Sequence, residues 1–73
     1  MTQEREFEFQ VEGLAADVIQ LLVTEDGISI EQAMDTLYQS RTFRALERPE
    51  TGLYYTSPVY IYDLIKSEEQ QTS

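Results

Sequence analysis

Apolar residues recur between residues 7 and 22 at the spacing of one helix face, and no other feature constrains the fold as strongly. Their offsets from the first are 4, 7, 8, 11, 14 and 15, and they are Phe7, Val11, Leu14, Ala15, Val18, Leu21 and Leu22. A helical period of 3.6 residues produces such a stripe. We therefore expect one long helix over about residues 5–24, forming the spine of an all-α domain.

Two features near the start of this helix leave an alternative open. Residues 6–12 alternate between polar and apolar side chains, which also fits a short strand. Gly13 would cost a helix interior about 1 kcal/mol relative to alanine. Either feature would move the start of the helix to Leu14.

A second, thinner apolar stripe lies on the far side of the same helix. It consists of Phe9, Ala16 and Val23, spaced seven residues apart. One interpretation is a self-interface, as in a homodimer. The other is that the rest of the chain covers this helix on both sides.

Shorter helices are predicted after the first. Gly27 supplies the residue that tolerates a left-handed conformation at a helix end, and Ser29 with Gln32 forms a capping box for a second helix. The offsets 0, 3, 4, 7 and 8 define its inward face, which we expect to consist of Ile30, Ala33, Met34, Leu37 and Tyr38.

Two further helix starts follow from capping residues. Ser40 is a suitable N-cap for a short helix over about residues 41–47, which would bury Phe43 and Leu46. Ser57 and Pro58 together predict the start of a last helix over about residues 58–67. Its inward face would carry Ile61, Leu64 and Ile65.

The remaining segments are expected to be irregular. Pro49 and Gly52 mark a loop, residues 53–55 fit an extended connector, and residues 68–73 fit a frayed polar tail. The expected fold is a single domain over residues 1–73, a compact bundle of three to four helices with a tyrosine-rich turn before the last one.

Composition argues against an enzyme. The chain has no cysteine and no histidine, which excludes thiol chemistry, Ser–His systems and most zinc sites. A chain of 73 residues is also too small to enclose a substrate easily. Glu25, Asp26 and Glu31 lack the alternating oxygen ligands of a calcium loop, so neither a metal site nor a cofactor is expected.

The charge is divided unevenly along the chain. The net charge is −9, of which residues 1–35 carry −8 and residues 36–73 carry −1. The acidic half repels phosphates and attracts a basic protein partner; alternatively, it only keeps the protein soluble. The second and third helices could imitate a helix-turn-helix, but the charge disfavours DNA binding.

Two further observations concern location. No apolar run approaches the roughly 20 residues of a membrane-spanning helix. The N-terminal residues lack the basic and apolar regions of a signal peptide. A cytoplasmic protein that does not bind membranes is therefore expected.

Four of the five tyrosines fall within residues 54–62. Tyrosine combines a large apolar ring with a polar hydroxyl, so Tyr54, Tyr55, Tyr60 and Tyr62 are candidates for a partner-binding patch. The alternative is that they cover a small core that contains no tryptophan, with the hydroxyls reaching water.

Three arginines would share one side of the short third helix: Arg41, Arg44 and Arg48. Guanidinium groups pair with carboxylates in two-pronged geometry, so Arg41 and Arg44 are candidates for binding an anionic group of a partner. The alternative is surface pairing with the acids of the first two helices, worth less than about 1 kcal/mol per pair.

A resemblance adds a functional expectation. The pattern from Gly52 to Leu64, GLYY-x-S-x-x-Y-x-YD-L, resembles a family of small bacterial proteins of unknown function, with weaker similarity over about residues 7–67. Some proteins of this family are encoded beside predicted toxins, including ADP-ribosyltransferase-like ones. The resemblance implies an antitoxin-like or accessory role, and it implies no catalytic residue.

These observations lead to one functional expectation and two alternatives. The first is a noncatalytic protein-binding module whose acidic first helix and tyrosine-rich corner hold a partner. The alternatives are a homo-oligomeric structural module and, against the charge, a DNA-binding regulator.

Overall fold

The chain folds into four α-helices, and the part of the chain that the structure describes contains no strand. The computed structural model describes residues 2–71, with side chains described for residues 5–70. The all-α prediction is therefore confirmed. Helix α1 spans Thr2–Asp26, α2 Ile30–Gln39, α3 Arg41–Leu46 and α4 Pro58–Gln71. Two 3₁₀ turns, η1 (Pro49–Thr51) and η2 (Leu53–Tyr55), join α3 to α4.

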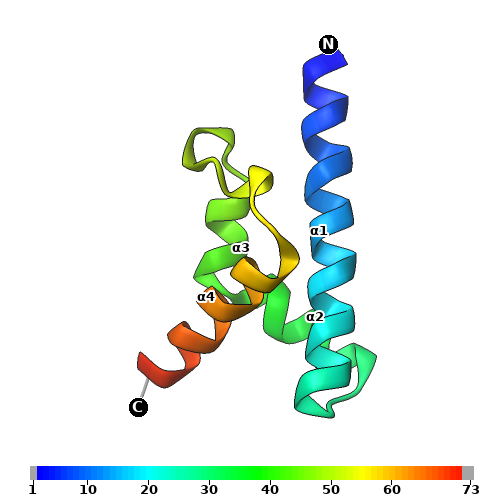
Figure 1. Ribbon diagram of the computed structural model, residues 1–73, viewed down its shortest axis with the longest axis vertical. Helices are drawn as coiled ribbons and strands as arrows, with labels where there is room; N and C mark the ends of the chain where they lie inside the picture. The colour runs from blue at the N-terminus through cyan, green and yellow to red at the C-terminus, as the bar shows by residue number, and fades with distance from the viewer. Residues whose placement is uncertain (1, 72–73) are drawn as a thin grey trace.

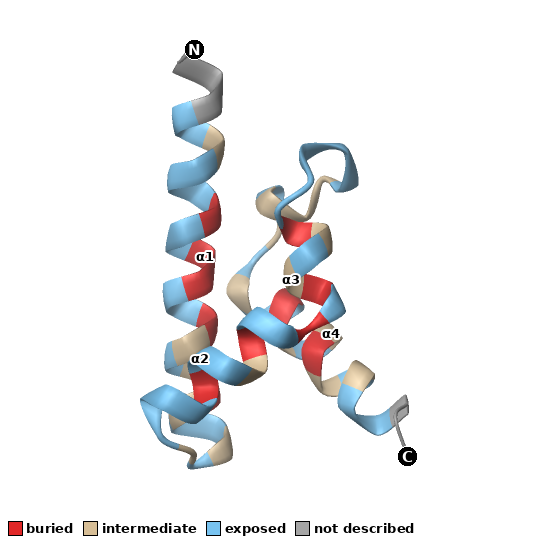
Figure 2. Cartoon of the chain, turned by 180° about the vertical axis from the view of Figure 1, so that it is seen from behind, coloured by how far each residue is buried: buried red, intermediate tan, exposed pale blue. Residues whose placement is uncertain are grey.

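Helix α1 is the spine against which α2, α4 and η2 pack (Figure 1). It is a single helix through the alternating segment 6–12 and through Gly13, so the strand alternative is wrong. Burial of the apolar face stabilises the helix by more than Gly13 and the alternating segment oppose it. The buried residues of this face are Val11, Leu14, Ala15, Val18 and Leu22. Figure 2 shows these buried residues along the side of α1 that faces the rest of the chain.

The core joins α1 to one short apolar row from each of the other helices. These rows consist of Ala33 and Leu37 on α2, Leu46 on α3, and Ile61 and Ile65 on α4. Leu64 on α4 and Phe43 on α3 are only half-buried, although the sequence predicted both to face inward. The core is therefore small, and each helix contributes only a few buried residues to it.

Helix α2 begins as predicted, but three of the five residues expected on its inward face are exposed. Ser29 accepts a hydrogen bond from the backbone N–H of Gln32, and the Gln32 side chain accepts one from the Ser29 N–H. Gly27, at φ 69°, makes the left-handed turn before this capping box. Ile30, Met34 and Tyr38 are 61%, 40% and 47% exposed, because α1 and α3 cover only the side that carries Ala33 and Leu37.

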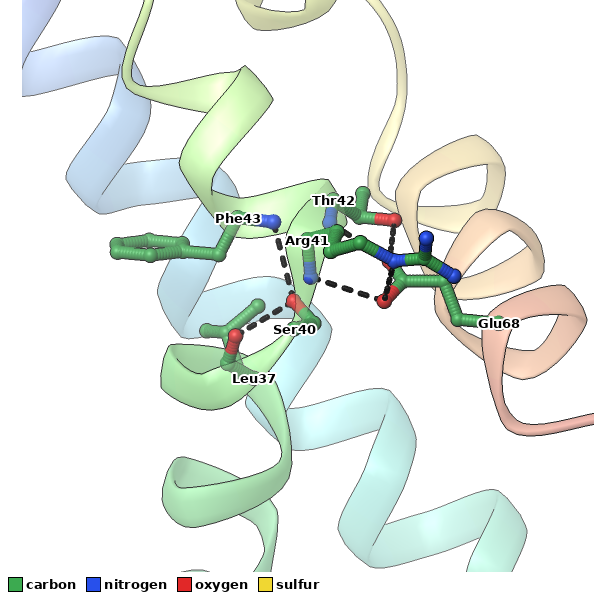
Figure 3. Close-up of polar contacts among 6 residues, drawn as sticks. All are labelled: Leu37, Ser40, Arg41, Thr42, Phe43 and Glu68. Atoms are coloured by element: carbon green, nitrogen blue, oxygen red, sulfur yellow. Dashed lines mark hydrogen bonds and ion pairs between the residues drawn. The ribbon is translucent and has the colours of Figure 1, made fainter. Parts of the chain in front are cut away.

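A single residue, Ser40, ends α2 and begins α3 (Figure 3). Its hydroxyl donates to the Leu37 carbonyl at 2.6 Å and accepts from the Phe43 N–H at 3.0 Å. One side chain therefore satisfies a carbonyl at the end of one helix and an N–H at the start of the next.

Residues 53–55 form a 3₁₀ turn, so the prediction of an extended connector is wrong. Gly52 adopts φ 71°, and its carbonyl accepts a hydrogen bond from the Tyr55 N–H at 3.1 Å. The Thr51 hydroxyl, 2.7 Å from the Ala45 carbonyl, ties this corner to α3. A glycine in the left-handed region allows the chain to pass directly from one 3₁₀ turn into the next.

Helix α4 continues to Gln71, so the prediction that the chain frays from residue 68 is wrong for residues 68–71; residues 72–73 lie outside the described part. The reason is Glu68, whose carboxylate accepts hydrogen bonds from the backbone N–H groups of Arg41 (2.8 Å) and Thr42 (2.6 Å) and from the Thr42 hydroxyl (Figure 3). These donors lie at the start of α3, where N–H groups have no partner within the helix.

Two opposing effects act on the pKa of Glu68. Partial burial raises the pKa, while the bonds from Thr42 and the Arg41 N–H, and the charge of Arg41, lower it. The net result is a pKa below the ordinary glutamate value. The folded state therefore favours the ionised carboxylate more than the unfolded state does.

The first prediction concerns this contact. Glu68→Gln should lower the free energy of unfolding at neutral pH by about 1.5 to 3 kcal/mol, because it replaces hydrogen bonds to a charged group. Since the folded pKa is depressed, the contribution is complete above the unfolded value of about 4.3 and is lost as pH falls through the folded pKa. Urea unfolding followed by circular dichroism over this pH range measures it.

Asp63→Asn is the control, since Asp63 is an exposed acid on the same helix. The stability difference between wild type and Glu68→Gln should shrink on acidification, and that between wild type and Asp63→Asn should stay near zero. A difference for Glu68→Gln that is constant with pH would contradict the assignment.

Candidate functional site

The tyrosine-rich segment contacts α1 at two separate places. The ring of Tyr54 packs edge-on against Phe7, with centroids 4.8 Å apart, and Tyr55 lies against Tyr54 at 4.2 Å. The hydroxyl of Tyr62 donates to Asp26 at 2.6 Å. Phe7 and Asp26 are 19 residues apart on α1, about 28 Å at the rise of an α-helix.

The four tyrosines therefore have different surroundings. Tyr54 and Tyr62 are half-buried against α1, as in the interpretation that tyrosines cover a small core. Tyr55 and Tyr60 are 77% and 48% exposed and remain available to a partner.

Asp26 is the centre of a polar cluster that the sequence analysis did not find. Its carboxylate accepts from Lys66 at 2.6 Å and from Tyr62, and Lys66 also lies 2.9 Å from Glu69. The hydrogen bonds from Lys66 and Tyr62 lower the pKa of Asp26, and the bonds to Asp26 and Glu69 raise the pKa of Lys66. The cluster ties the end of α1 to the middle of α4.

Helix α3 ends at Leu46, so Arg48 lies beyond it and the prediction that all three arginines share one side of that helix is wrong for Arg48. Two of the three face carboxylates of the chain itself. Arg41 lies 3.8 Å from Glu68, and Arg48 pairs with Glu50 at 3.1 Å. Surface pairing thus accounts for these two, with acids of α4 and η1 rather than of α1 and α2. Arg44 is exposed and stays a candidate for a partner contact. Helix α3 has only six residues, a short element for a DNA-recognition helix.

A groove runs between α1 and the α2–α3 pair, and the sequence analysis did not predict it. Its volume is 570 Å³. The α1 side carries Val11, Ala15, Ala16 and Ile19, and the opposite side carries Tyr38 and Phe43. Because Ala16 is exposed and Tyr38 is 47% exposed, the groove is open to solvent.

Aromatic pairs support both sides of this groove. Tyr38 and Phe43 meet edge-on at 5.0 Å, so α2 and α3 present one joint aromatic wall. Phe7 lies at the other side and is held by Tyr54. The tyrosine-rich corner therefore contributes to the groove indirectly, through Phe7.

The polar residues of the groove are all acidic. Glu8 and Glu12 lie on α1 and Glu47 follows α3, whereas no lysine or arginine lines it. The spacing of Glu8 and Glu12 places both on one side of the helix. The groove therefore combines apolar walls with an acidic rim, which consists of Glu8, Glu12 and Glu47.

The exposed face of α2 extends the apolar surface beyond the groove. Ile30, Met34 and Tyr38 are four residues apart and share one side of α2. Their spacing predicted that they share one apolar side of α2, which is confirmed, and that this side faces inward, which is wrong for these three. These residues are exposed because no element of the described chain covers this side of α2.

The three residues expected at a self-interface are divided by the fold. Phe9 is 77% exposed and Ala16 is exposed and lines the groove. Val23 is half-buried and packs against the core, so it offers little to another chain.

Among residues 5–70, no group of three or more acidic side chains lies close enough together to hold a metal ion. None of the described helices combines the length and apolar character needed to cross a bilayer.

Comparisons with family models, curated proteins and solved structures found no match to this chain. The resemblance carried by residues 52–64 therefore stays a prediction. Functional inference rests on the geometry of the groove and the exposed residues around it.

The second prediction separates structural from exposed tyrosines. Tyr62→Phe removes the hydrogen bond to Asp26 and should lower the urea midpoint of unfolding, whereas Tyr60→Phe should leave it unchanged because Tyr60 is exposed. Both variants lose one hydroxyl, so each is the control for the other. Equal midpoints would show that the contact between Tyr62 and Asp26 contributes nothing to stability.

Proposed function

We propose that this chain is a noncatalytic protein-binding module that holds a partner in the groove between α1 and the α2–α3 pair. The observation that carries the proposal is the open apolar groove itself, with Tyr38 and Phe43 forming an aromatic wall. Aromatic side chains that stay accessible in a preformed depression supply much of the binding energy in protein interfaces. Exposed Ile30 and Met34 enlarge the surface available to the partner.

The resemblance of residues 52–64 to proteins encoded beside predicted toxins supports an antitoxin-like or accessory role in the cytoplasm. Under this proposal the partner is the product of a neighbouring gene. Tyr54 acts as a support for Phe7 rather than as a contact. Tyr55, Tyr60 and Arg44 are exposed and are further candidate contacts for the same partner.

The third prediction tests the groove. Ala16→Trp fills the groove from an exposed position without changing the charge, and should reduce partner binding at least about tenfold. Gln10→Trp is the control, since Gln10 is exposed on α1 and does not line the groove. Tagged wild type and both variants are purified from the native cells, and bound proteins are quantified by mass spectrometry.

A stoichiometric partner retained by Gln10→Trp and lost by Ala16→Trp supports the groove. A partner retained equally by all three chains would move the binding site elsewhere on the surface. Recovery of no partner with the wild-type chain would count against the binding function itself.

The second candidate function is a homo-oligomeric module. It is favoured by Phe9, a large apolar side chain that is 77% exposed on α1, on the same line of the helix as Ala16. A second copy would cover both residues.

The fourth prediction concerns this alternative. Phe9→Glu should convert an oligomer into a folded monomer, because it places a charge in an apolar contact. Gln10→Glu adds the same charge at the neighbouring exposed position and should leave the oligomer intact. Light scattering coupled to size exclusion measures the mass. A monomeric wild-type chain at the highest soluble concentration would eliminate this candidate.

A further inference from the structure

The acidic rim of the groove restricts the chemistry of its occupant. Glu8, Glu12 and Glu47 line the groove, and none of them forms a hydrogen bond or ion pair with another side chain among residues 5–70. By contrast, Asp26 and Glu68 are engaged by Lys66 and by the start of α3. The rim carboxylates are thus distinct from the acids that stabilise the fold.

The arrangement of two of these carboxylates is unfavourable in the free chain. Glu8 and Glu12 are four residues apart on α1, and like charges at this spacing repel each other on a helix. A cationic group placed between them would relieve this repulsion. Acidic segments and nucleic acids are repelled by the same rim.

The dimensions of the groove suit a helix. The α1 residues that line it run from Phe7 to Ile19, which corresponds to about 18 Å, or about 12 residues of a bound helix. The short side chains of Ala15 and Ala16 lie on the α1 side, opposite Tyr38 and Phe43, so apolar residues of a helix can enter between them. An amphipathic helix presents such residues at spacings of three and four.

We propose that the groove binds a basic amphipathic helix of the partner, with its apolar face toward Tyr38 and Phe43 and its lysines or arginines against Glu8, Glu12 and Glu47. This inference rests on the proposed function and specifies the partner of the same site. The apolar face supplies most of the affinity, and the charges select the partner and accelerate its association.

The fifth prediction uses a synthetic probe. A fluorescein-labelled amphipathic helix of leucine and lysine, about 14 residues long so that it spans the roughly 12 residues of the groove, is titrated with the full chain by fluorescence anisotropy. Two control peptides separate the contributions. One has every lysine replaced by glutamine, and the other has the same composition in a scrambled order without an amphipathic face.

Two triple variants of equal net charge provide the control on the protein. The first removes the rim charges through Glu8→Gln, Glu12→Gln and Glu47→Gln. The second removes three exposed charges that do not line the groove, through Glu6→Gln, Asp17→Asn and Asp63→Asn. Circular dichroism confirms that both remain folded.

The rim variant should bind the basic helix at least about tenfold more weakly than wild type, and the matched variant within about threefold. Both control peptides should bind wild type at least about tenfold more weakly than the probe. Equal weakening of both variants, or equal binding of the scrambled peptide, would reduce the effect to general attraction by an acidic chain and overturn the proposal. Equal binding of the glutamine peptide would overturn the role of the rim.

The two proposals fail in different ways. If Ala16→Trp loses the native partner while the rim variant keeps it, the groove is the binding site and the basic helix is wrong. If the probe behaves as expected but the native partner is insensitive to Ala16→Trp, the chemistry of the groove is correct and the proposed function is wrong.

Discussion

The position of α4 depends on two carboxylates that act at a distance along the sequence. Asp26, the last residue of α1, engages Tyr62 and Lys66 of α4, and Glu68 of α4 engages the first residues of α3. Between these contacts Ile61 and Ile65 enter the core. A chain without disulfides and with so small a core gains disproportionately from such contacts, because each fixes a whole helix relative to another. Hydrogen bonds from charged donors or from orphan N–H groups at a helix start are also stronger than ordinary surface pairs.

The groove follows from how this arrangement distributes the short helices around α1. Helices α2 and α4 and the η2 turn contact α1, and α3 lies beside α4 and η2 on the same side of α1 (Figure 1). Ser40 joins α2 to α3 with no intervening loop, so Tyr38 and Phe43 come from different helices and still form one pair. No further element of the described chain remains to cover the outer side of α2. The apolar residues on that side of α2 therefore stay exposed, although they belong to an amphipathic pattern.

Local sequence patterns predicted the elements better than their surroundings. The stripe on α1, the capping box at Ser29, and the helix starts at Ser40 and Pro58 all depend on residues close together in the chain, and all are confirmed. The errors came from contacts distant in sequence. The tail beyond residue 67 is helical because Glu68 finds partners 26 and 27 residues earlier, and no local period encodes that contact. The 3₁₀ turn of residues 53–55 is the exception, since it depends on Gly52 at φ 71° and on the hydrogen bond from Thr51 to the Ala45 carbonyl, six residues earlier.

At the candidate site, too, the sequence predicted which residues are apolar or aromatic but not what covers them. An amphipathic pattern identified Ile30, Met34 and Tyr38 as apolar residues on one side of α2, but not whether another element would cover them. The tyrosine-rich segment predicted a contact surface, yet Tyr54 and Tyr62 are used within the chain and only Tyr55 and Tyr60 remain exposed. Phe7 and Tyr54 could not be paired from sequence, since 47 residues separate them.

The acidic composition of the first half also serves two different purposes in the fold. Asp26 contributes to stability, since its carboxylate is satisfied by α4, whereas Glu8 and Glu12 repel each other beside an apolar surface. Acids placed only for solubility would be expected away from the apolar groove, because a carboxylate that becomes desolvated without a partner destabilises whatever covers it. In the proposed function, their position on the rim disfavours an acidic occupant and favours one that brings its own cations. In the proposed function, the three rim charges out of a net −9 act as a criterion for partner selection, in addition to the general effect of the net charge on association.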